Sequence, residues 1–252
     1  MSHHLVEADQ LVHVYPDGTR ALDGVSFTIT HGESVAIIGA NGAGKSTLLL
    51  HLNGVLLPSS GSVRIGHTPV TTATLGHIRR TVGLVFQNPD DQLFMPIVRE
   101  DVAFGPRNLG FSGPELERCV MDALRQVDAI HLADKPPYNL SGGEKKRAAI
   151  AAVLAMSPDI LVMDEPTSGL DPHARRQLIG LIREFQHTRI ITSHDLDMVY
   201  DVCQRVIVLK DGRVAADGPA AAIFADKGLL EGCRLEQPLR IQGCPACGGK
   251  PC

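Results

Sequence analysis

A glycine-rich segment, Gly39-Ala-Asn-Gly-Ala-Gly44-Lys45-Ser46, carries the clearest chemistry in this sequence. Its spacing is that of a P-loop, in which glycines let backbone N–H groups turn toward phosphate oxygens. Lys45 is expected to bridge the β- and γ-phosphates, and the Ser46 hydroxyl to ligate Mg²⁺. The segment therefore predicts a site for ATP with Mg²⁺. The expected contacts are Gly39, Asn41, Gly42, Gly44, Lys45, Ser46 and Thr47.

A dinucleotide-binding loop is the other glycine-rich candidate, but it requires a different glycine spacing and an acidic residue about 20 positions further on. Residues 34–89 contain neither Asp nor Glu. The same stretch carries Lys45, Arg64, Arg79 and Arg80, an excess of positive charge that suits a polyanion. The alternative, that these arginines simply face solvent, remains open.

A second motif, Asp164-Glu165, directly follows an apolar run over residues 160–163. A buried strand of this kind delivers carboxylates to the carboxyl edge of a sheet, where ligands bind. We expect Asp164 to hold Mg²⁺ through water and Glu165 to polarise the attacking water. An isolated Asp-Glu pair is usually a surface pair, and it is the preceding apolar run and the P-loop that favour catalysis.

These residues must be positioned by an α/β fold. A short apolar strand, residues 34–39, precedes the P-loop, and a helix over 45–55 follows it. Short β-branched runs at 82–86, 160–163, 189–192 and 206–209 predict a mixed, mostly parallel sheet covered by helices. Alternating residues 5–14 and 22–29, around a Tyr-Pro-Asp-Gly turn, predict an N-terminal antiparallel β region.

The chain divides by pattern into a domain over residues 1–225 and a tail over 226–252 that is rich in glycine, proline and cysteine. Within the domain, residues of about 89–156 read as a helical subdomain. Breaks are expected there at Gly105-Pro106 and at Pro136-Pro137.

Ser141 is expected to cap a helix that begins within Leu140-Ser-Gly-Gly-Glu144. By itself the segment predicts only a helix start. Together with the P-loop and the Asp-Glu motif, it resembles the signature sequence of ABC ATPases, which usually ends in Gln where this chain has Glu144. The resemblance implies that Ser141 and Gly143 contact the γ-phosphate, so the fold expected is a P-loop NTPase core of the ABC ATPase type.

Other segments resemble further ABC ATPase motifs in the same order. Tyr15 stands where the family stacks an aromatic ring on adenine. Gln87 stands at the position of the Q-loop glutamine, for which the resemblance implies roles in catalysis and in Mg²⁺ binding. Residues 168–171 resemble the D-loop, and His194 the switch histidine. Alone, Tyr15 would be read as hairpin packing and His194 as a polar loop end. Because the signature of one subunit closes on the P-loop of another in this family, the resemblance implies a homodimer with two active sites.

A finer resemblance, over about residues 5–225, is to the ATPase subunits of energy-coupling-factor importers, particularly the cobalt and nickel group. It rests on residues 85–94 and 101–109. In that family, Gln87 would connect the nucleotide site to a groove that receives helices of the transmembrane subunit. Acidic and apolar contacts to that subunit are expected from Asp90, Asp91, Leu93 and Phe94. The alternative is an ordinary subdomain junction with Phe94 in the core.

The resemblance implies a peripheral ATPase at the cytoplasmic face of the cell membrane. Its partners would be a second copy, a transmembrane coupling subunit and, indirectly, a substrate-binding membrane subunit. The cargo would be cobalt or nickel ions, or alternatively a vitamin. From other classes, a soluble ABC-type ATPase that acts as an assembly scaffold and a non-hydrolysing regulatory subunit stay open. Glu165 and His194 argue against the second of these, because both hydrolytic positions are present.

Composition limits the possible partners. The 252 residues carry a net charge of −4, which disfavours nucleic acid as a partner. Apolar runs such as residues 148–156 are about half the length that a bilayer-spanning helix needs, and the first residues lack a secretory pattern.

Four of the six cysteines lie in the last twenty residues: Cys233, Cys244, Cys247 and Cys252. The C-x-x-C spacing of Cys244 and Cys247 suits a tetrahedral ion such as Zn²⁺, with the other two available to complete the shell. The alternative is a disordered tail whose cysteines stay reduced in the cytosol.

Overall fold

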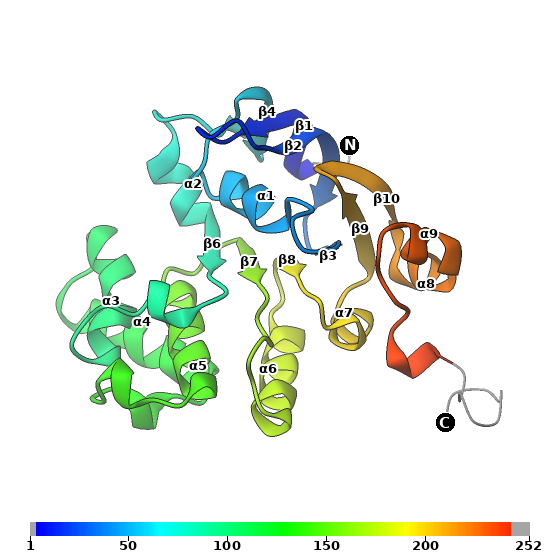
Figure 1. The fold of residues 1–252 in the computed structure, drawn as a ribbon. Helices are drawn as coiled ribbons and strands as arrows, with labels where there is room; N and C mark the ends of the chain where they lie inside the picture. Colours follow the sequence, from blue (N-terminus) through cyan, green and yellow to red (C-terminus); the bar gives the residue numbers. More distant parts are fainter. Residues whose placement is uncertain (1–3, 243–252) are drawn as a thin grey trace. The chain divides into compact units, whose positions relative to one another are not determined.

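The computed structural model describes residues 4–242 (Figure 1). The chain forms two compact units. Of the described residues, 4–78 and 187–242 make the first unit, and 79–186 make the second. The first unit contains the P-loop and His194, and the second contains Gln87, the signature segment and the Asp164-Glu165 pair.

The first unit begins with an antiparallel sheet, as the alternating pattern predicts. Its strands in spatial order are β2 (Arg20–Thr30), β1 (His4–Val14), β4 (Ser60–Ile65) and β5 (Thr68–Pro69). The turn between β1 and β2 is closed by a hydrogen bond from the Gly18 N–H to the Tyr15 carbonyl, at 2.9 Å. Strands β4 and β5 were not predicted from the sequence.

A second set of strands in this unit leads to the P-loop. In spatial order they are β10 (Arg213–Pro219), β9 (Arg205–Lys210), β3 (Ser34–Ile38) and β8 (Thr188–Thr192). β3 runs parallel to both β8 and β9, and β10 is antiparallel to β9. All five residues of β3 are buried, as expected for a strand covered on both faces.

Helix α1 (Lys45–Leu52) follows the P-loop and ends three residues before the predicted boundary. Asn53 caps it, and Gly54 then adopts a left-handed φ of 69° that does not continue a helix. The other helices of the described first unit are α7 (Leu196–Val202), α8 (Ala220–Ala225), α9 (Lys227–Gly232) and the 3₁₀ turn η4 (Leu239–Ile241); α2 (Leu75–Thr81) crosses the boundary between the units.

The second unit combines two parallel strands with a group of helices. β6 (Val82–Val85) pairs with β7 (Ile160–Asp164). Helices α3 (Val98–Asn108), α4 (Gly113–Gln126) and α5 (Gly142–Leu154) pack on one another (Figure 1). The remaining elements are α6 (Pro172–Glu184) and the 3₁₀ turns η1 (Pro89–Asp91), η2 (Ile130–Leu132) and η3 (Pro137–Asn139).

The predicted break at Gly105-Pro106 is wrong, because α3 continues through it to Asn108. Pro106 lies in the last turn, where its missing N–H costs one helical hydrogen bond, and its ring is buried. Gly105 serves packing, since a Cβ there would lie 2.6 Å from Met156 Sδ. The chain turns at Gly110, which has a φ of 94°.

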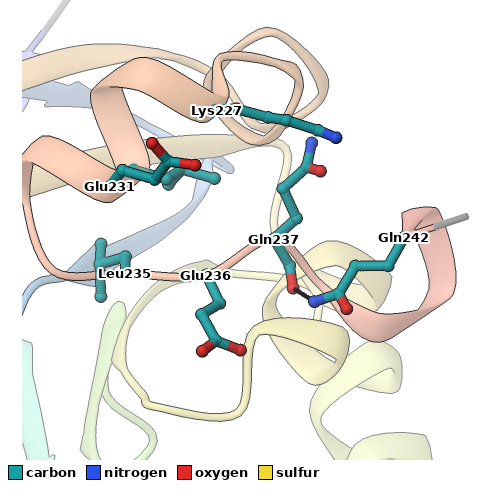
Figure 2. Close-up of a pocket in the computed structure, with 7 residues that line it drawn as sticks. Lys227, Glu231, Leu235, Glu236, Gln237 and Gln242 are labelled. Atoms are coloured by element: carbon teal, nitrogen blue, oxygen red, sulfur yellow. Dashed lines mark hydrogen bonds between the residues drawn. The ribbon is translucent and has the colours of Figure 1, made fainter. Parts of the chain in front are cut away.

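The described part of the tail packs against helices of the first unit. Gln237 Nε2 donates to the Phe224 carbonyl at 2.7 Å, and the Arg240 N–H donates to Asp197 Oδ1 of α7 at 3.0 Å. Figure 2 shows the cavity of about 360 Å³ beside α9, with Gln242 Nε2 donating to the Gln237 carbonyl. Its lining residues are Lys227, Leu230, Glu231, Leu235, Glu236, Gln237 and Gln242.

The predicted metal site in the tail lies outside the described residues, apart from Cys233. That thiol is buried, with an exposed fraction of 4%. Among residues 4–242, no group of three or more His, Cys, Asp or Glu side chains could hold a metal ion. No helix in the same range is long and apolar enough to cross a membrane.

Candidate functional site

The P-loop connects β3 to the first turn of α1. Gly42 and Gly44 have φ values of 80° and 100°, a left-handed conformation that favours glycine. Gly39 is needed for a different reason, since a Cβ there would lie 2.4 Å from the Leu209 carbonyl oxygen of β9. The loop thus passes close to β9 before α1 begins.

Lys45 lies over this loop with its side chain mostly buried. Its Nζ donates to the carbonyl oxygens of Gly39 at 2.8 Å and Ala40 at 3.3 Å. The same Nζ is 3.3 Å from Nε2 of His194, which follows β8. Because an ammonium group can only donate, Nε2 accepts this bond. The structure therefore brings together two predicted site residues that are 149 positions apart.

Tyr15 lies beside α1. Its hydroxyl is 3.0 Å from Thr47 Oγ1, and its ring contacts the edge of His13 at a centroid distance of 4.6 Å. The ring is half-buried. The structure thus joins Tyr15 to Thr47, while adenine stacking stays a prediction.

Two histidines next to Tyr15 were missed by the sequence reading. His51 Nδ1 donates to the Thr47 carbonyl oxygen at 2.7 Å, and His51 Nε2 lies 3.2 Å from His13 Nδ1. Burial lowers the pKa of His51, and the proximity of His13 lowers it further, so the neutral form of the His51 ring is favoured. Residue type and spacing gave no signal, because a lone histidine on a strand and another on a helix are common core residues.

The exposed groups of the P-loop fit a triphosphate with a hard cation. Asn41, Gly42 and Ser46 face solvent, whereas Lys45 and Thr47 are buried. A Cβ at Gly42 would meet nothing within 4 Å, so the space beside that backbone is open. An ammonium and backbone N–H groups can bind phosphate oxygens, and a hydroxyl oxygen can ligate Mg²⁺.

In the second unit, β7 delivers Asp164 and Glu165 to its carboxyl end, as predicted. Asp164 is half-buried, and Glu165 has an exposed fraction of 7%. Glu165 has a φ of 45°, a conformation that costs a non-glycine residue energy and often marks a functional position. The Ser168 N–H donates to its carbonyl at 3.1 Å, which closes the turn after the strand.

The signature segment begins α5 with Ser141 as its cap, which confirms the predicted helix start. The Ser141 N–H donates to Glu144 Oε2 at 2.8 Å, and the Glu144 N–H donates to Ser141 Oγ at 3.4 Å, a reciprocal capping box. The bond from the Ser141 backbone holds the pKa of Glu144 below its usual range. Gly143 packs on α6, since a Cβ there would lie 2.9 Å from the Ala174 Cβ.

A cavity of about 270 Å³ brings three of the predicted motifs together within the second unit. Its lining residues are Gln87, Asn88, Pro89, Gly142, Lys146, Ser168, Gly169 and Leu170. Lys146, on α5, was not singled out from the sequence. Its Nζ donates to the Gln87 carbonyl and, at 3.3 Å, to the Glu165 carbonyl.

The segment after Gln87 holds one exposed aromatic pair. Phe94 has an exposed fraction of 62% and meets Phe104 of α3 edge-to-face at 5.0 Å. Asp101 fixes this position, because its Oδ1 accepts from the N–H groups of Phe94 at 2.9 Å and Met95 at 3.0 Å. The alternative that placed Phe94 in the core is wrong.

Two other residues expected at this surface are engaged within the chain. Leu93 is buried, with an exposed fraction of 7%, so it does not offer the apolar contact that we expected. The reason is that the adjacent Gln92 side chain donates to the Ala149 carbonyl at 2.8 Å and holds this part of the segment against α5. Asp90 forms an ion pair with Lys145 at 2.6 Å.

Comparison with known proteins gives consistent findings. The profile of the family described as ABC transporter matches residues 22–168. An ABC transporter ATP-binding protein of Geobacter sulfurreducens is 68% identical over 98% of this chain and 100% of its own length. The energy-coupling factor transporter ATP-binding protein EcfA of Methanococcus maripaludis is 47% identical over 93% of this chain and 86% of its own.

Two solved structures share the fold. The structure of cbiO1 from Clostridium perfringens, part of the ABC transporter complex cbiONQ, aligns with a TM-score of 0.80 and 41% identity, over 91% of this chain and 94% of its own. The dimeric ATP-binding cassette MJ0796, in a post-hydrolysis state with ADP and Pi, aligns with a TM-score of 0.77 and 29% identity, over 85% of this chain and 98% of its own.

Proposed function

Since this chain belongs to the ABC transporter family as an ATPase component, we propose that it powers an energy-coupling-factor importer for cobalt or nickel ions. ATP is its substrate and Mg²⁺ its cofactor, and hydrolysis is coupled to transport. When bound, Mg²⁺ offsets the charge of the phosphate oxygens. The proposal concerns the residues that perform the reaction, the partners and the cargo.

For hydrolysis, Glu165 acts as the base that orients water, and Lys45 binds the β- and γ-phosphates. Ser46, Gln87 and Asp164 hold Mg²⁺, and His194 supports the γ-phosphate. The Lys45–His194 contact and the exposed hydroxyl of Ser46 support these roles.

The nucleotide is further held by Tyr15, which stacks on adenine, and by the signature residues Ser141 and Gly143. The signature residues act on the P-loop of a second copy of the chain, so that a homodimer forms two sites. The dimeric state of the MJ0796 cassette supports this arrangement.

The docking surface for a transmembrane coupling subunit is the aromatic pair Phe94 and Phe104, together with Asp91. The single observation that carries this proposal is the exposure of Phe94, seven residues after Gln87, with its backbone N–H bonded to Asp101. Exposed aromatic side chains beside charged residues are typical anchors of protein interfaces. The chain then lies peripherally at the cytoplasmic face of the cell membrane and reaches the substrate-binding membrane subunit indirectly.

Cobalt or nickel is supported by the resemblance of residues 85–94 and 101–109 to that importer group. A vitamin importer with the same coupling module is the second candidate. A soluble assembly scaffold would have no use for the exposed aromatic pair.

The proposal is tested by purifying the tagged protein from membranes in mild detergent. Phe94→Ala should lose the transmembrane coupling subunit while basal ATPase activity of the purified chain stays within about twofold, since the Phe94 side chain is exposed and packs on Phe104. Tyr138→Ala is the matched control, because Tyr138 is an aromatic of the same unit with an exposed fraction of 79%. Uptake of radiolabelled cobalt or nickel into vesicles that hold the complex identifies the cargo. Retention of the partner by the Phe94 variant would contradict the docking surface.

A further inference from the structure

Lys146 is a buried lysine on the helix that begins with the signature segment. Its exposed fraction is 3%. Burial of an ammonium group is costly unless hydrogen bonds replace its lost water. Here the replacement comes from two main-chain carbonyls, those of Gln87 and Glu165.

These two carbonyls lie just beyond the carboxyl ends of paired strands. β6 ends at Val85 and β7 at Asp164, and the two strands run parallel with Val85 opposite Met163. Lys146 therefore joins the backbone at the points where both strands lead into their loops. Desolvation lowers the pKa of Lys146, and the nearby charges of Asp164 and Glu165 oppose that shift.

A lysine near the surface can satisfy its charge with a carboxylate or with solvent. Lys145, the preceding residue, does so through Asp90. Lys146 instead contacts the main chain of two residues with proposed roles in the reaction, and it lines the cavity that Gln87, Gly142 and Ser168 also line. One side chain thus connects three motifs within the second unit.

We propose that Lys146 is a positioning residue that fixes the backbone of Gln87 and Glu165 and so orients both side chains for hydrolysis. The inference rests on the proposed function, because it acts through the roles of those two residues. Since Lys146 contacts the main chain of the second unit and is assigned no contact with ATP, its loss should lower kcat and leave KM for ATP nearly unchanged.

The experiment compares Lys146→Met, Lys146→Gln and the control Lys145→Met. The Met variant should lower kcat at least ~10-fold with KM for ATP within about threefold, whereas the control should match the wild type. The Gln variant, whose shorter neutral amide replaces only part of the contact, should lose an intermediate amount. Rates are divided by the concentration of sites that bind an ATP analogue, so that unfolded protein does not count.

A second readout separates positioning from general damage. In a Glu165→Gln background, Lys146→Gln should lower the rate much less than it does in the wild type, because the residue through which it acts is already altered. Wild-type kcat in Lys146→Gln alone would overturn the proposal, even if Lys146→Met does not fold. The proposal would also be overturned if Lys146→Gln lowered the hydrolysis rate by the same factor in the Glu165→Gln background as in the wild type. If Glu165→Gln alone hydrolyses ATP at the wild-type rate, the assignment of Glu165 as the base is wrong. The kcat of Lys146→Gln alone still tests the role of Lys146.

Discussion

At the scale of residues, substitutions of Glu165 and Lys45 should impair different steps of the reaction. Glu165→Gln should still bind ATP but hydrolyse it at least ~100-fold more slowly, because a positioned base is lost. Lys45→Ala should weaken nucleotide binding itself, since the ammonium acts on the phosphates in both the ground and the transition state. ATP turnover and fluorescent-nucleotide binding measure the two effects. Wild-type turnover by the Glu165 variant would show that the base is another residue.

Glu144 gives a prediction about pH. Its pKa is lowered in the folded chain by the hydrogen bond from the Ser141 backbone, so the ionised form favours folding. That stabilisation is present above the usual carboxyl pKa and is lost as the pH falls through the lowered value. Glu144→Gln, which installs the usual family residue, should keep the acceptor and remove this pH dependence. Thermal midpoints between about pH 6 and about pH 3 should therefore fall less in the variant. Equal falls would contradict this account.

At the scale of elements, the P-loop depends on how closely β3 and β9 pack. Gly39→Ala should destabilise the chain by about 1–3 kcal/mol, because its Cβ would overlap the Leu209 carbonyl oxygen at 2.4 Å. Urea unfolding measures the loss, and nucleotide binding should weaken with it. The matched control is Gly76→Ala on α2, where a Cβ would meet nothing within 4 Å. A Gly39 variant as stable as this control would exclude a packing role.

At the scale of the whole molecule, the homodimer predicts complementation. Lys45→Ala damages the P-loop, and Ser141→Asp keeps a good helix cap while placing a negative charge where the γ-phosphate is expected. Each variant alone should be inactive. If every site combines the P-loop of one copy with the signature of the other, mixed dimers contain one intact site.

An equimolar, re-equilibrated mixture of the two variants should therefore recover about a quarter of wild-type activity, for independent sites and random pairing. The mixture of each variant with itself is the control. No recovery, in a mixture shown to form mixed dimers, would mean that each chain uses its own signature segment.

The sequence alone determined the main motifs of this protein and several of its strands. The P-loop spacing at Gly39–Ser46, the Asp164-Glu165 pair after a buried strand and the Ser141 cap are all properties of neighbouring residues. The strands β1, β2, β3 and β7 followed from alternation or from short apolar runs. Such patterns can be predicted because backbone hydrogen bonds and side-chain period act over a few positions.

Contacts between distant positions were decided only by the tertiary structure. Neither the Lys45–His194 pair nor the bonds of Lys146 to the two carbonyls has a local signal, because each depends on which loops the folded sheets bring together. The same holds for Leu93 and Phe94, adjacent apolar residues of which one is buried and the other exposed. Burial is a property of the packed surface rather than of residue type, so the sequence could name these residues without saying which of them faces a partner.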